Sequence, residues 1–385
     1  MTNFTLPRKQ LQKIINLCNQ ISVKRSEVEI FTFTKIILLP QSVELSVASG
    51  IIYYRAELPA ENIETTEETS FLVKTETLAS IVALMTDEKL HFELDTKKGN
   101  LVIKGSRSKH NLRINTDIEQ FNLPQMEEEN MQVRMTVKAA DLILANRFGL
   151  ISVGLPKNIY QPEFLNVCYS FVDDIVFAVS TDRFRIIKHK IPTENIELNA
   201  EVEQPKNFLF LPKNLQILNS AIEESDVKVT LESGLAFFEF DSQTLICRYG
   251  DGKYPDYNKI IPQSFACNFV LNVKDTLDAL RQVYFFAKAN IINKNINIEV
   301  KPEISQIKFG ATTDEGNSSE STLTFQNYEG QLESWTQAFN ADYLLEYISS
   351  LSCESFLWES NPSKPSVLSP LDNKENQLYL VSGLK

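Results

Sequence analysis

A pattern of hydrophobic and polar residues recurs six times along the chain. In each copy a short apolar strand ends, and a helix follows whose apolar anchor lies seven residues after the start of the copy. Successive starts are 67, 64, 73, 62 and 67 residues apart. Each copy continues with apolar residues at helical spacing, which predicts six amphipathic helices that each bury one face. The copies cover residues 4–11, 71–78, 135–142, 208–215, 270–277 and 337–344.

The segments between these helices show the alternation that is typical of strands. They are rich in β-branched and aromatic residues, as in KLHFELDTKKGNLVIKGS (89–106) and DVKVTLESGLAFFEFDSQTLICRY (226–249). A helix on the few strands of one copy buries little surface, so we expect two copies to share a domain of about 130 residues. The predicted fold class is α+β, with three similar domains of two β-α-β-β-β-like units each. These domains cover residues 1–131, 132–264 and 265–385.

The composition is that of an ordinary globular protein, with 43% hydrophobic and 23% charged residues. No apolar run approaches the ~18 residues of a membrane helix, and the N-terminus shows no apolar leader. We therefore expect a soluble, cytoplasmic protein without a membrane partner. The five cysteines are scattered without a C-x-x-C pair, which predicts buried free thiols. The three histidines share no ligand-like spacing, so no metal site is predicted.

The chain lacks the common catalytic motifs. The Gly-Lys of GDGKY (250–254) has neither the Ser/Thr nor the spacing of a phosphate-binding loop, and GSRSKH (105–110) is no nucleophile elbow. Acid pairs such as Asp173-Asp174 are typical of a solvated surface in a chain with 50 acidic residues. We expect a protein that is not an enzyme and that uses no cofactor.

The net charge of −12 argues against a surface covered with basic patches. It leaves room for one basic surface, because charge can be segregated. The six predicted helices together carry +2, which leaves −14 for the rest of the chain. Lys24 and Arg25 follow the first helix in a loop, where contact with phosphate and plain solvation are both open.

Three segments carry the most specific motifs: VFAVSTDRFRIIKHKIP (176–192), DGKYPDYNKIIP (251–262) and AFNADYLLEYISSL (338–351). In order and spacing they resemble the V-A-T-D-G-H-R-L, D-G-x-(F/Y)-P-D-Y-x-x-(V/I)-(L/I)-P and F-N-x-x-Y-L-x-x-(V/I)-L segments of the bacterial DNA sliding clamps. This family is the β subunit of the replicative DNA polymerase III. The resemblance covers the whole chain, with looser matches at KPSVLSP (364–370) and LYLVSGL (378–384).

The resemblance implies a head-to-tail homodimer that closes into a ring around double-stranded DNA. Helices with weak positive charge would line the hole and hold the duplex topologically, without reading its sequence. The dimer contact is expected at Lys109, His110 and Leu112, with Phe285 and Phe286 as further candidates, although His110 equally suits an ordinary strand surface. The residues expected to face DNA are Arg8, Lys9, Lys13, Lys24, Arg25, Lys138, Arg147, Lys213 and Arg281.

The resemblance also implies a hydrophobic pocket for short peptide motifs of the replicative polymerase and the clamp loader. Leu165 and Ile260, taken alone, would equally suit a domain core. Arg183-Phe184 departs from the family's Gly-His, and Ser382-Gly383 departs from its C-terminal M-P-(M/V)-R-L. Carried over by motif, the pocket consists of Leu165, Thr181, Arg185, Ile186, Pro255, Lys259, Ile260, Asn340, Tyr343, Ser363, Pro365, Leu380, Val381, Ser382, Gly383 and Leu384.

Two other functions remain open. A clamp-fold scaffold would bind peptides through the same pocket without encircling DNA, and it would be monomeric or differently assembled. An enzyme with an unrecognised site would need a deep polar pocket that holds acids of perturbed pKa.

Overall fold

The structure is a computed structural model that describes residues 2–63, 68–156, 161–199, 206–250, 252–289, 294–362 and 364–384. The chain forms two compact units. Unit 1 consists of Met1–Leu142, Thr193–Val202 and Lys213–Gly250. Unit 2 consists of Ile143–Pro192, Glu203–Pro212 and Asp251–Lys385. In the described part of the chain, no helix is long and apolar enough to cross a membrane.

The predicted repeat is confirmed in the described residues. Every α-helix begins three or four residues after the start of one sequence copy, follows one strand and precedes at least three more. The helices are α1 (Arg8–Ile21), α2 (Thr75–Leu84), α3 (Ala139–Gly149), α4 (Pro212–Ala221), α5 (Val273–Ala289) and α6 (Ala341–Ile348). The predicted α+β class is therefore correct.

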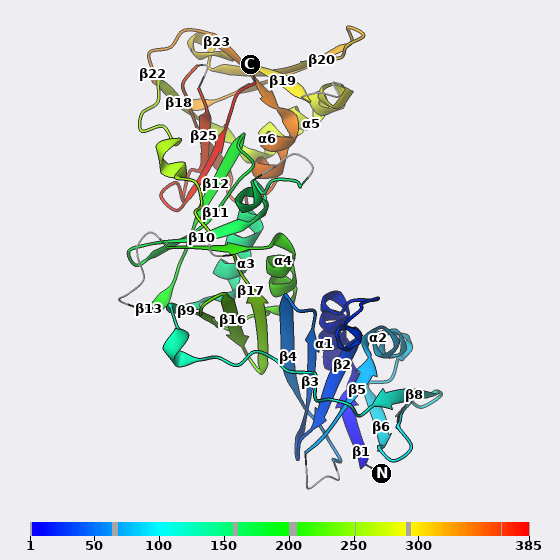
Figure 1. The fold of residues 1–385 in the computed structure, drawn as a ribbon. Coiled ribbons are helices and arrows are strands. Elements are labelled where there is room, and N and C mark those ends of the chain that lie inside the picture. Colours follow the sequence, from blue (N-terminus) through cyan, green and yellow to red (C-terminus); the bar gives the residue numbers. More distant parts are fainter. Residues whose placement is uncertain are drawn as a thin grey trace. The chain divides into compact units, whose positions relative to one another are not determined.

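Unit 1 contains one antiparallel sheet of 13 strands in the order β1-β6-β7-β8-β5-β2-β3-β4-β17-β16-β15-β9-β13. Helices α1 and α2 pack side by side (Figure 1). Short 3-10 helices lie at Glu29–Thr32 and Glu128–Asn130. The strands are β1 (Thr2–Pro7), β2 (Phe33–Leu38), β3 (Ser42–Ala48), β4 (Ile52–Pro59), β5 (Thr69–Lys74), β6 (Lys89–Asp95), β7 (Asn100–Lys104), β8 (Lys109–Asn115), β9 (Val133–Val137), β13 (Glu194–Leu198), β15 (Val227–Leu231), β16 (Leu235–Phe240) and β17 (Gln243–Arg248).

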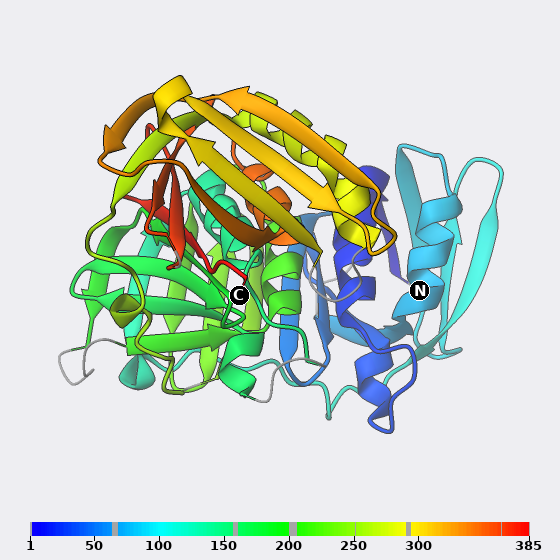
Figure 2. The same cartoon turned by 90° about the horizontal axis from the view of Figure 1, so that it is seen from above.

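Unit 2 contains a sheet of nine strands, β14-β10-β11-β12-β26-β25-β24-β18-β22, and a sheet of four, β21-β20-β19-β23. Helix α5 lies along one face of the smaller sheet and contacts α6 (Figure 2). The strands are β10 (Val167–Val172), β11 (Ile175–Thr181), β12 (Arg185–Ile191), β14 (Lys206–Phe210), β18 (Cys267–Asn272), β19 (Asn295–Lys301), β20 (Gln306–Thr312), β21 (Ser318–Thr324), β22 (Gln326–Gly330), β23 (Trp335–Asn340), β24 (Ser355–Ser360), β25 (Ser366–Pro370) and β26 (Gln377–Val381). Short 3-10 helices are η3 (Pro162–Leu165), η4 (Tyr257–Lys259) and η5 (Pro302–Ile304).

The predicted helix anchors pack on the core. In five copies the leucine seven residues after the start is at most 1% exposed: Leu11, Leu78, Leu142, Leu215 and Leu344. In the fifth copy Leu277 packs against the core but is only partly buried, while the neighbouring Thr276 is fully buried. The free thiols of Cys18, Cys168, Cys247 and Cys267 are buried, as predicted, whereas Cys353 is half-buried.

The predicted three-domain division is not tested by these units and stays a prediction. Strand β8 ends at Asn115 and β9 begins at Val133, so the first expected boundary lies in a segment without strands. The second expected boundary lies between β17, which ends at Arg248, and β18, which begins at Cys267.

Candidate functional site

The first candidate site is built on the turn between β11 and β12 in unit 2. Arg183 in this turn has φ 80°, a left-handed conformation that glycine adopts freely and that costs other residues free energy. Thr181 Oγ1 accepts a hydrogen bond from the backbone N–H of Arg183 at 3.1 Å. Asp182 Oδ1 accepts from the backbone N–H groups of Phe184 and Arg185 at 3.0 and 3.1 Å. The turn thus keeps a conformation that suits the family's glycine, although Arg183 occupies it.

The guanidinium of Arg185 is buried and hydrogen-bonded to two carboxylates. Its Nε donates to Asp182 Oδ2 at 2.9 Å, and its Nη1 donates to Glu346 Oε2. The Arg185 Cζ lies 4.2 Å from the centroid of the Tyr343 ring, so the cation also stacks on an aromatic face. Because the side chain of Arg185 is only 8% exposed, these contacts fix it as a rigid part of the site.

Helix α6 brings Tyr343 to this arginine. Asn340 caps the helix, since its side-chain oxygen accepts from the backbone N–H of Asp342 at 2.9 Å. The hydroxyl of Tyr379 on β26 donates to the Tyr343 carbonyl at 2.8 Å. Burial, with a smaller effect of the nearby Asp182 charge, raises the pKa of Tyr343 to about 12. Tyr343 is therefore a neutral phenol at physiological pH.

The C-terminal strand and segment complete the inner wall of this region. Strands β12 and β26 pair Ile186 with Leu380, and both side chains are buried, as is Val381. The backbone N–H of Ser382 donates to the Phe184 carbonyl at 2.9 Å, which ties the C-terminal segment to the turn. A Cβ built on Gly383 would lie 2.1 Å from Gln337 Nε2, so a larger residue at this position would force Gln337 to move. Leu384 continues the segment by donating to the Ala338 carbonyl at 2.7 Å.

Other predicted pocket residues lie farther along the chain around the 3-10 helices η3 and η4. Leu165 and Pro255 are half-buried, Ile260 is 54% exposed, and Lys259 forms an ion pair with Asp256 at 3.0 Å. In the described part of the chain no hydrogen bond, ion pair or ring contact joins them to Arg185 or Tyr343. Pro365 is half-buried, and Ser363 lies outside the described residues. Their membership in one pocket stays a prediction.

Sequence reasoning missed the partners that hold the predicted residues. Asp182 and Glu346 bind Arg185, and Tyr254 and Tyr257 pack with Ile186 in one apolar cluster. The sequence did contain a signal for the ion pair of Asp182 with Arg185, because the two residues have opposite charge and are three positions apart. The tyrosines stood inside the quoted DGKYPDYNKIIP segment, but only the structure places their rings under β12.

The basic residues expected to face DNA differ in how strongly the protein itself engages them. Arg8 donates to the Asp87 carbonyl at 2.9 Å and to Gln12 Oε1 at 2.6 Å. Lys13, Lys24, Lys138 and Arg281 form ion pairs with Glu223, Glu76, Glu194 and Asp278. Such exposed pairs are weak and can exchange for phosphate. Of the nine residues expected to face DNA, the exposed ones that form no ion pair with any described residue are Lys9, Arg25, Arg147 and Lys213.

Each unit leaves a strand edge open. In unit 1, β8 pairs with β7 from Lys109 to Arg113 but with β5 only at Ile114 and Asn115. Lys109 is exposed, His110 is half-buried, and Leu112 is buried within the unit, so its place in a dimer contact stays a prediction. In unit 2, β21 is an outer strand of the smaller sheet and pairs with β20.

Near that second edge lies a large exposed aromatic ring. Phe285 on α5 is 76% exposed, and its ring meets Phe286 edge-on with centroids 5.6 Å apart. Helix α5 packs on β21, so this apolar surface adjoins the open edge within unit 2. Among the described residues no group of three or more His, Cys, Asp or Glu side chains could hold a metal ion.

Comparisons with known proteins agree along the entire chain. The chain is 22% identical over 391 residues to the beta sliding clamp of Halalkalibacterium halodurans, covering 100% of this chain and 99% of that protein. It is 24% identical over 393 residues to the beta sliding clamp of Rickettsia bellii, with full coverage of both. No protein-family model matches.

The solved structures agree in fold. The DNA polymerase sliding clamp of Bacillus subtilis superposes with a TM-score of 0.86 at 18% identity, covering 100% of this chain and 99% of that one. A sliding clamp of Pseudomonas aeruginosa, solved with griselimycin bound, gives 0.84 at 16% identity, again covering 100% and 99%. The resemblance to the bacterial sliding clamps, the DNA polymerase III β subunit family, is thus confirmed over the full chain, and the chain has the fold of that family.

Proposed function

We propose that this chain is a DNA sliding clamp: a non-catalytic processivity factor that encircles double-stranded DNA as a head-to-tail homodimer. The observation that carries the proposal is the sixfold repeat of strand, helix and strands, which runs the length of the chain and matches sliding clamps from end to end. A ring holds DNA by topology, so neither a catalytic centre nor a sequence-reading element is needed.

We infer three domains, 1–131, 132–264 and 265–385, each built from two copies of the repeat. The strand-free segments before β9 and before β18 support these boundaries. Two such chains would bring six similar domains into one ring, and a head-to-tail contact that repeats twice would close it.

The open edges of β8 and β21 support a closure in which these two strands pair across the dimer. Pairing would satisfy backbone groups that an isolated edge leaves exposed. The β8 edge carries exposed Lys109 and Arg113, whereas β21 carries exposed Glu320. Phe285 would lose its exposed apolar surface in the same contact.

Weak positive charge on the helices supports sliding rather than tight binding. The exposed unpaired cations Lys9, Arg25, Arg147 and Lys213 would contact phosphates through water or at long range. The ion-paired ones, such as Lys13 with Glu223, would contribute less because the protein already holds them. Because the ring would make only a few strong contacts with DNA, the duplex could move through it.

The region around Arg185 and Tyr343 would bind short peptide motifs of the replicative polymerase and the clamp loader. Its rigid guanidinium, capped helix and tied C-terminal segment support a pre-formed site. Phe184, which is 57% exposed, would add an apolar surface next to it where the family has histidine. We therefore expect its peptide preference to differ from that of its relatives.

Topology provides the decisive test. The protein is loaded by its clamp loader onto a nicked circular plasmid, and the plasmid is then cut once. A ring stays on the circle through gel filtration and leaves the linear form, whereas a protein bound by contacts alone behaves identically on both. Retention that does not depend on plasmid topology would contradict the proposal.

A clamp-fold scaffold that never encircles DNA is the second candidate. It is favoured by the net charge of −12 and by the ion pairs that occupy Lys13, Lys24, Lys138 and Arg281. Light scattering after size exclusion at micromolar concentration separates the two. A dimer supports the clamp, and a monomer that still binds polymerase peptides supports the scaffold.

A further inference from the structure

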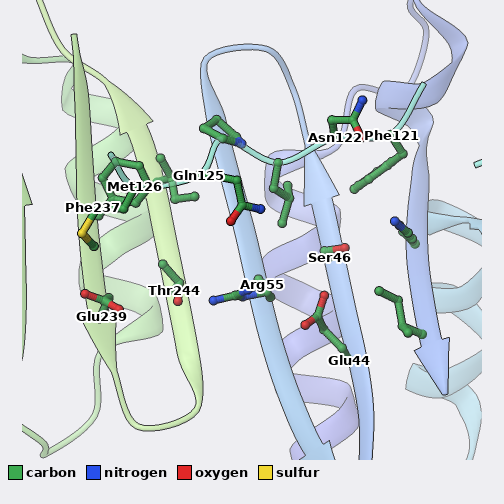
Figure 3. Close-up of a pocket in the computed structure, with 15 residues that line it drawn as sticks. Glu44, Ser46, Arg55, Phe121, Asn122, Gln125, Met126, Phe237, Glu239 and Thr244 are labelled. Atoms are coloured by element: carbon green, nitrogen blue, oxygen red, sulfur yellow. The ribbon is translucent and has the colours of Figure 1, made fainter. Parts of the chain in front are cut away.

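A cavity of about 330 Å³ opens on the sheet of unit 1, beside the chain segment Phe121–Met126 (Figure 3). We call this segment the strap. It follows β8 and crosses strands β2, β3, β4, β17 and β16, all of which contribute residues to the cavity. The volume is within the range of small-ligand sites and would hold one amino-acid-sized group.

One side of the cavity is apolar. Phe121, Leu123 and Met126 of the strap pack in one cluster with Phe237 of β16 and Ile246 of β17. Phe121, Phe237 and Ile246 are buried, whereas Leu123 and Met126 are only partly buried. The strap therefore covers an apolar row of the sheet and leaves apolar surface facing the opening.

The floor of the cavity is a single polar row across five strands. The register pairs Lys35 with Ser46, Ser46 with Arg55, Arg55 with Thr244, and Thr244 with Glu239. Because paired residues of neighbouring strands project to the same face, all five side chains lie on the side that the strap crosses. Figure 3 shows Arg55 extending from β4 toward Thr244.

Two cations, Arg55 and Lys35, lie in this row. Arg55 is exposed, and its side chain forms no ion pair or hydrogen bond with any described residue. Lys35 also forms no ion pair in the described part of the chain, and its Nζ lies 5.8 Å from the Phe121 ring centroid. The lining also contains two acids, Glu44 and Glu239, and Glu239 lies 3.9 Å from Lys228 outside the lining. The charges of the lining thus sum to zero, but neither of its two cations, among the described residues, is held in an ion pair beside the apolar wall.

We propose that this cavity binds a monocarboxylate on an apolar residue-sized group, as found in an N-acylated apolar amino acid or the C-terminal residue of a peptide. The carboxylate would pair with Arg55 and Lys35, and the apolar group would contact Met126 and Phe237 under the strap. A dianion such as phosphate is disfavoured, because Glu44 and Glu239 flank the guanidinium. Glu239 Oε2 is buried without a hydrogen-bond partner and can accept the amide N–H that both sources share.

The methionines give a direct readout, because the chain has five and Met126 is the one on this cavity. We would label the methionine methyl groups of the full-length protein with carbon-13 and titrate N-acetyl-L-leucine and, separately, a tetrapeptide with a free C-terminal leucine. The matched controls are the C-terminal amides of both compounds. We expect the acids to shift the Met126 methyl signal in a saturable way. The amides should bind with at least about tenfold lower affinity. The signals of buried Met85 and Met135 should not shift.

Arg55→Gln should weaken the acid about tenfold, because one charge-assisted hydrogen bond is lost. Arg55→Lys should recover part of the affinity. Arg107→Gln, the same change at an exposed arginine between β7 and β8 that does not line the cavity, should leave the affinity unchanged. Binding of either acid supports the site. Binding of only one identifies the source, and binding of both shows that the site accepts a free acyl amino acid as well as a peptide C-terminus. Equal shifts with acid and amide, a non-saturating shift, or unchanged affinity in Arg55→Gln would overturn the proposal. DNA and ring closure play no part in this test, so its outcome is independent of the proposed function.

Discussion

Two arginines, Arg185 in unit 2 and Arg55 in unit 1, occupy opposite electrostatic situations. Arg185 is buried, hydrogen-bonded to Asp182 and Glu346, and stacked on Tyr343. Arg55 is exposed in the polar floor of a cavity, and its side chain has no such partner among the described residues. A buried cation must be paired to be tolerated, whereas an exposed one can stay free for a ligand. Arg185 therefore shapes a surface, and Arg55 is available to bind an anion.

The largest expected difference between them concerns stability. Arg185→Met leaves the carboxylate of Asp182, a mostly buried residue, without its cation, so we expect the free energy of unfolding to fall by about 3 kcal/mol. Arg55→Met removes no internal contact and should change it by less than about 0.5 kcal/mol. Urea unfolding followed by circular dichroism measures both. Equal midpoints for the two variants would contradict the assignment of Arg185 as a locked structural cation.

Peptide affinity should also depend on the region around Arg185 and not on the region around Arg55. Tyr343→Ala removes a half-buried ring from the first site without unpairing Arg185 from Asp182. We expect a polymerase-derived peptide to bind about thirtyfold more weakly, the usual effect of losing a central aromatic contact. Fluorescence anisotropy with labelled peptide gives the affinity. The peptide carries a C-terminal amide, so that it cannot pair with Arg55 through a free carboxylate. Arg55→Ala is then the matched control, and a loss of the same size there would show that the peptide does not discriminate between the regions.

The contrast between the two regions also shows what sequence can predict. The repeat located the six helices of the described residues, because burying one helix face requires apolar residues at fixed spacing, as with Leu11 and Leu344. At α5 it identified Leu277, which packs on the core but is only partly buried. It did not identify the fully buried Thr276, whose hydroxyl donates to the Asn272 carbonyl at 2.6 Å. Periodicity records hydrophobicity, and a buried threonine that satisfies its own hydroxyl is invisible to it.

The strap cavity was beyond sequence reasoning for a different reason. Its floor depends on the pairing of β4 with β17, residues about 190 positions apart, which brings Arg55 opposite Thr244. No local pattern encodes such a register, and the polar sequence QMEEENMQ (125–132) contains no motif that would indicate a cavity. In contrast, Arg185 and Tyr343 stood inside motifs that already resembled a known family, so their proximity could be expected.

A smaller effect should distinguish paired from free cations on the helices. Lys9 is exposed without an ion pair, whereas Lys13 on the same helix is held by Glu223. If Lys9 contacts phosphate, Lys9→Gln should lower the slope of log affinity against log salt by about 0.9 for a short duplex, and Lys13→Gln by less than half of that. Anisotropy over a salt series measures both slopes. Identical slopes in the two variants would remove the distinction and weaken the assignment of Lys9 to DNA.

The smallest expected effect is a pH dependence that originates in the strap cavity. Burial raises the pKa of Glu44 above its ordinary value of 4.5, and Arg55 and Lys35 oppose this only in part. Below 4.5 the carboxyl is protonated in both the folded and the unfolded chain, so it has no effect on stability there. As the pH rises from 4.5 through the raised folded pKa, the unfolded chain loses the proton first, and stability falls.

Glu44→Gln should abolish that decrease, so that the variant gains stability relative to the parent protein between acidic and neutral pH. Arg55→Gln should widen the pH interval of the decrease, because it removes the strongest cation that lowers the Glu44 pKa. The measurement is an NMR titration of the Glu44 carboxyl in the parent protein, in Arg55→Gln and in Arg185→Lys. Arg185→Lys is the control and should leave the Glu44 titration unchanged. An identical Glu44 titration in the parent and in Arg55→Gln would show that Arg55 does not interact with this carboxylate. Glu44 would then not repel a second negative charge on a ligand bound to Arg55, and the preference for a single carboxylate over a dianion would rest on Glu239 alone.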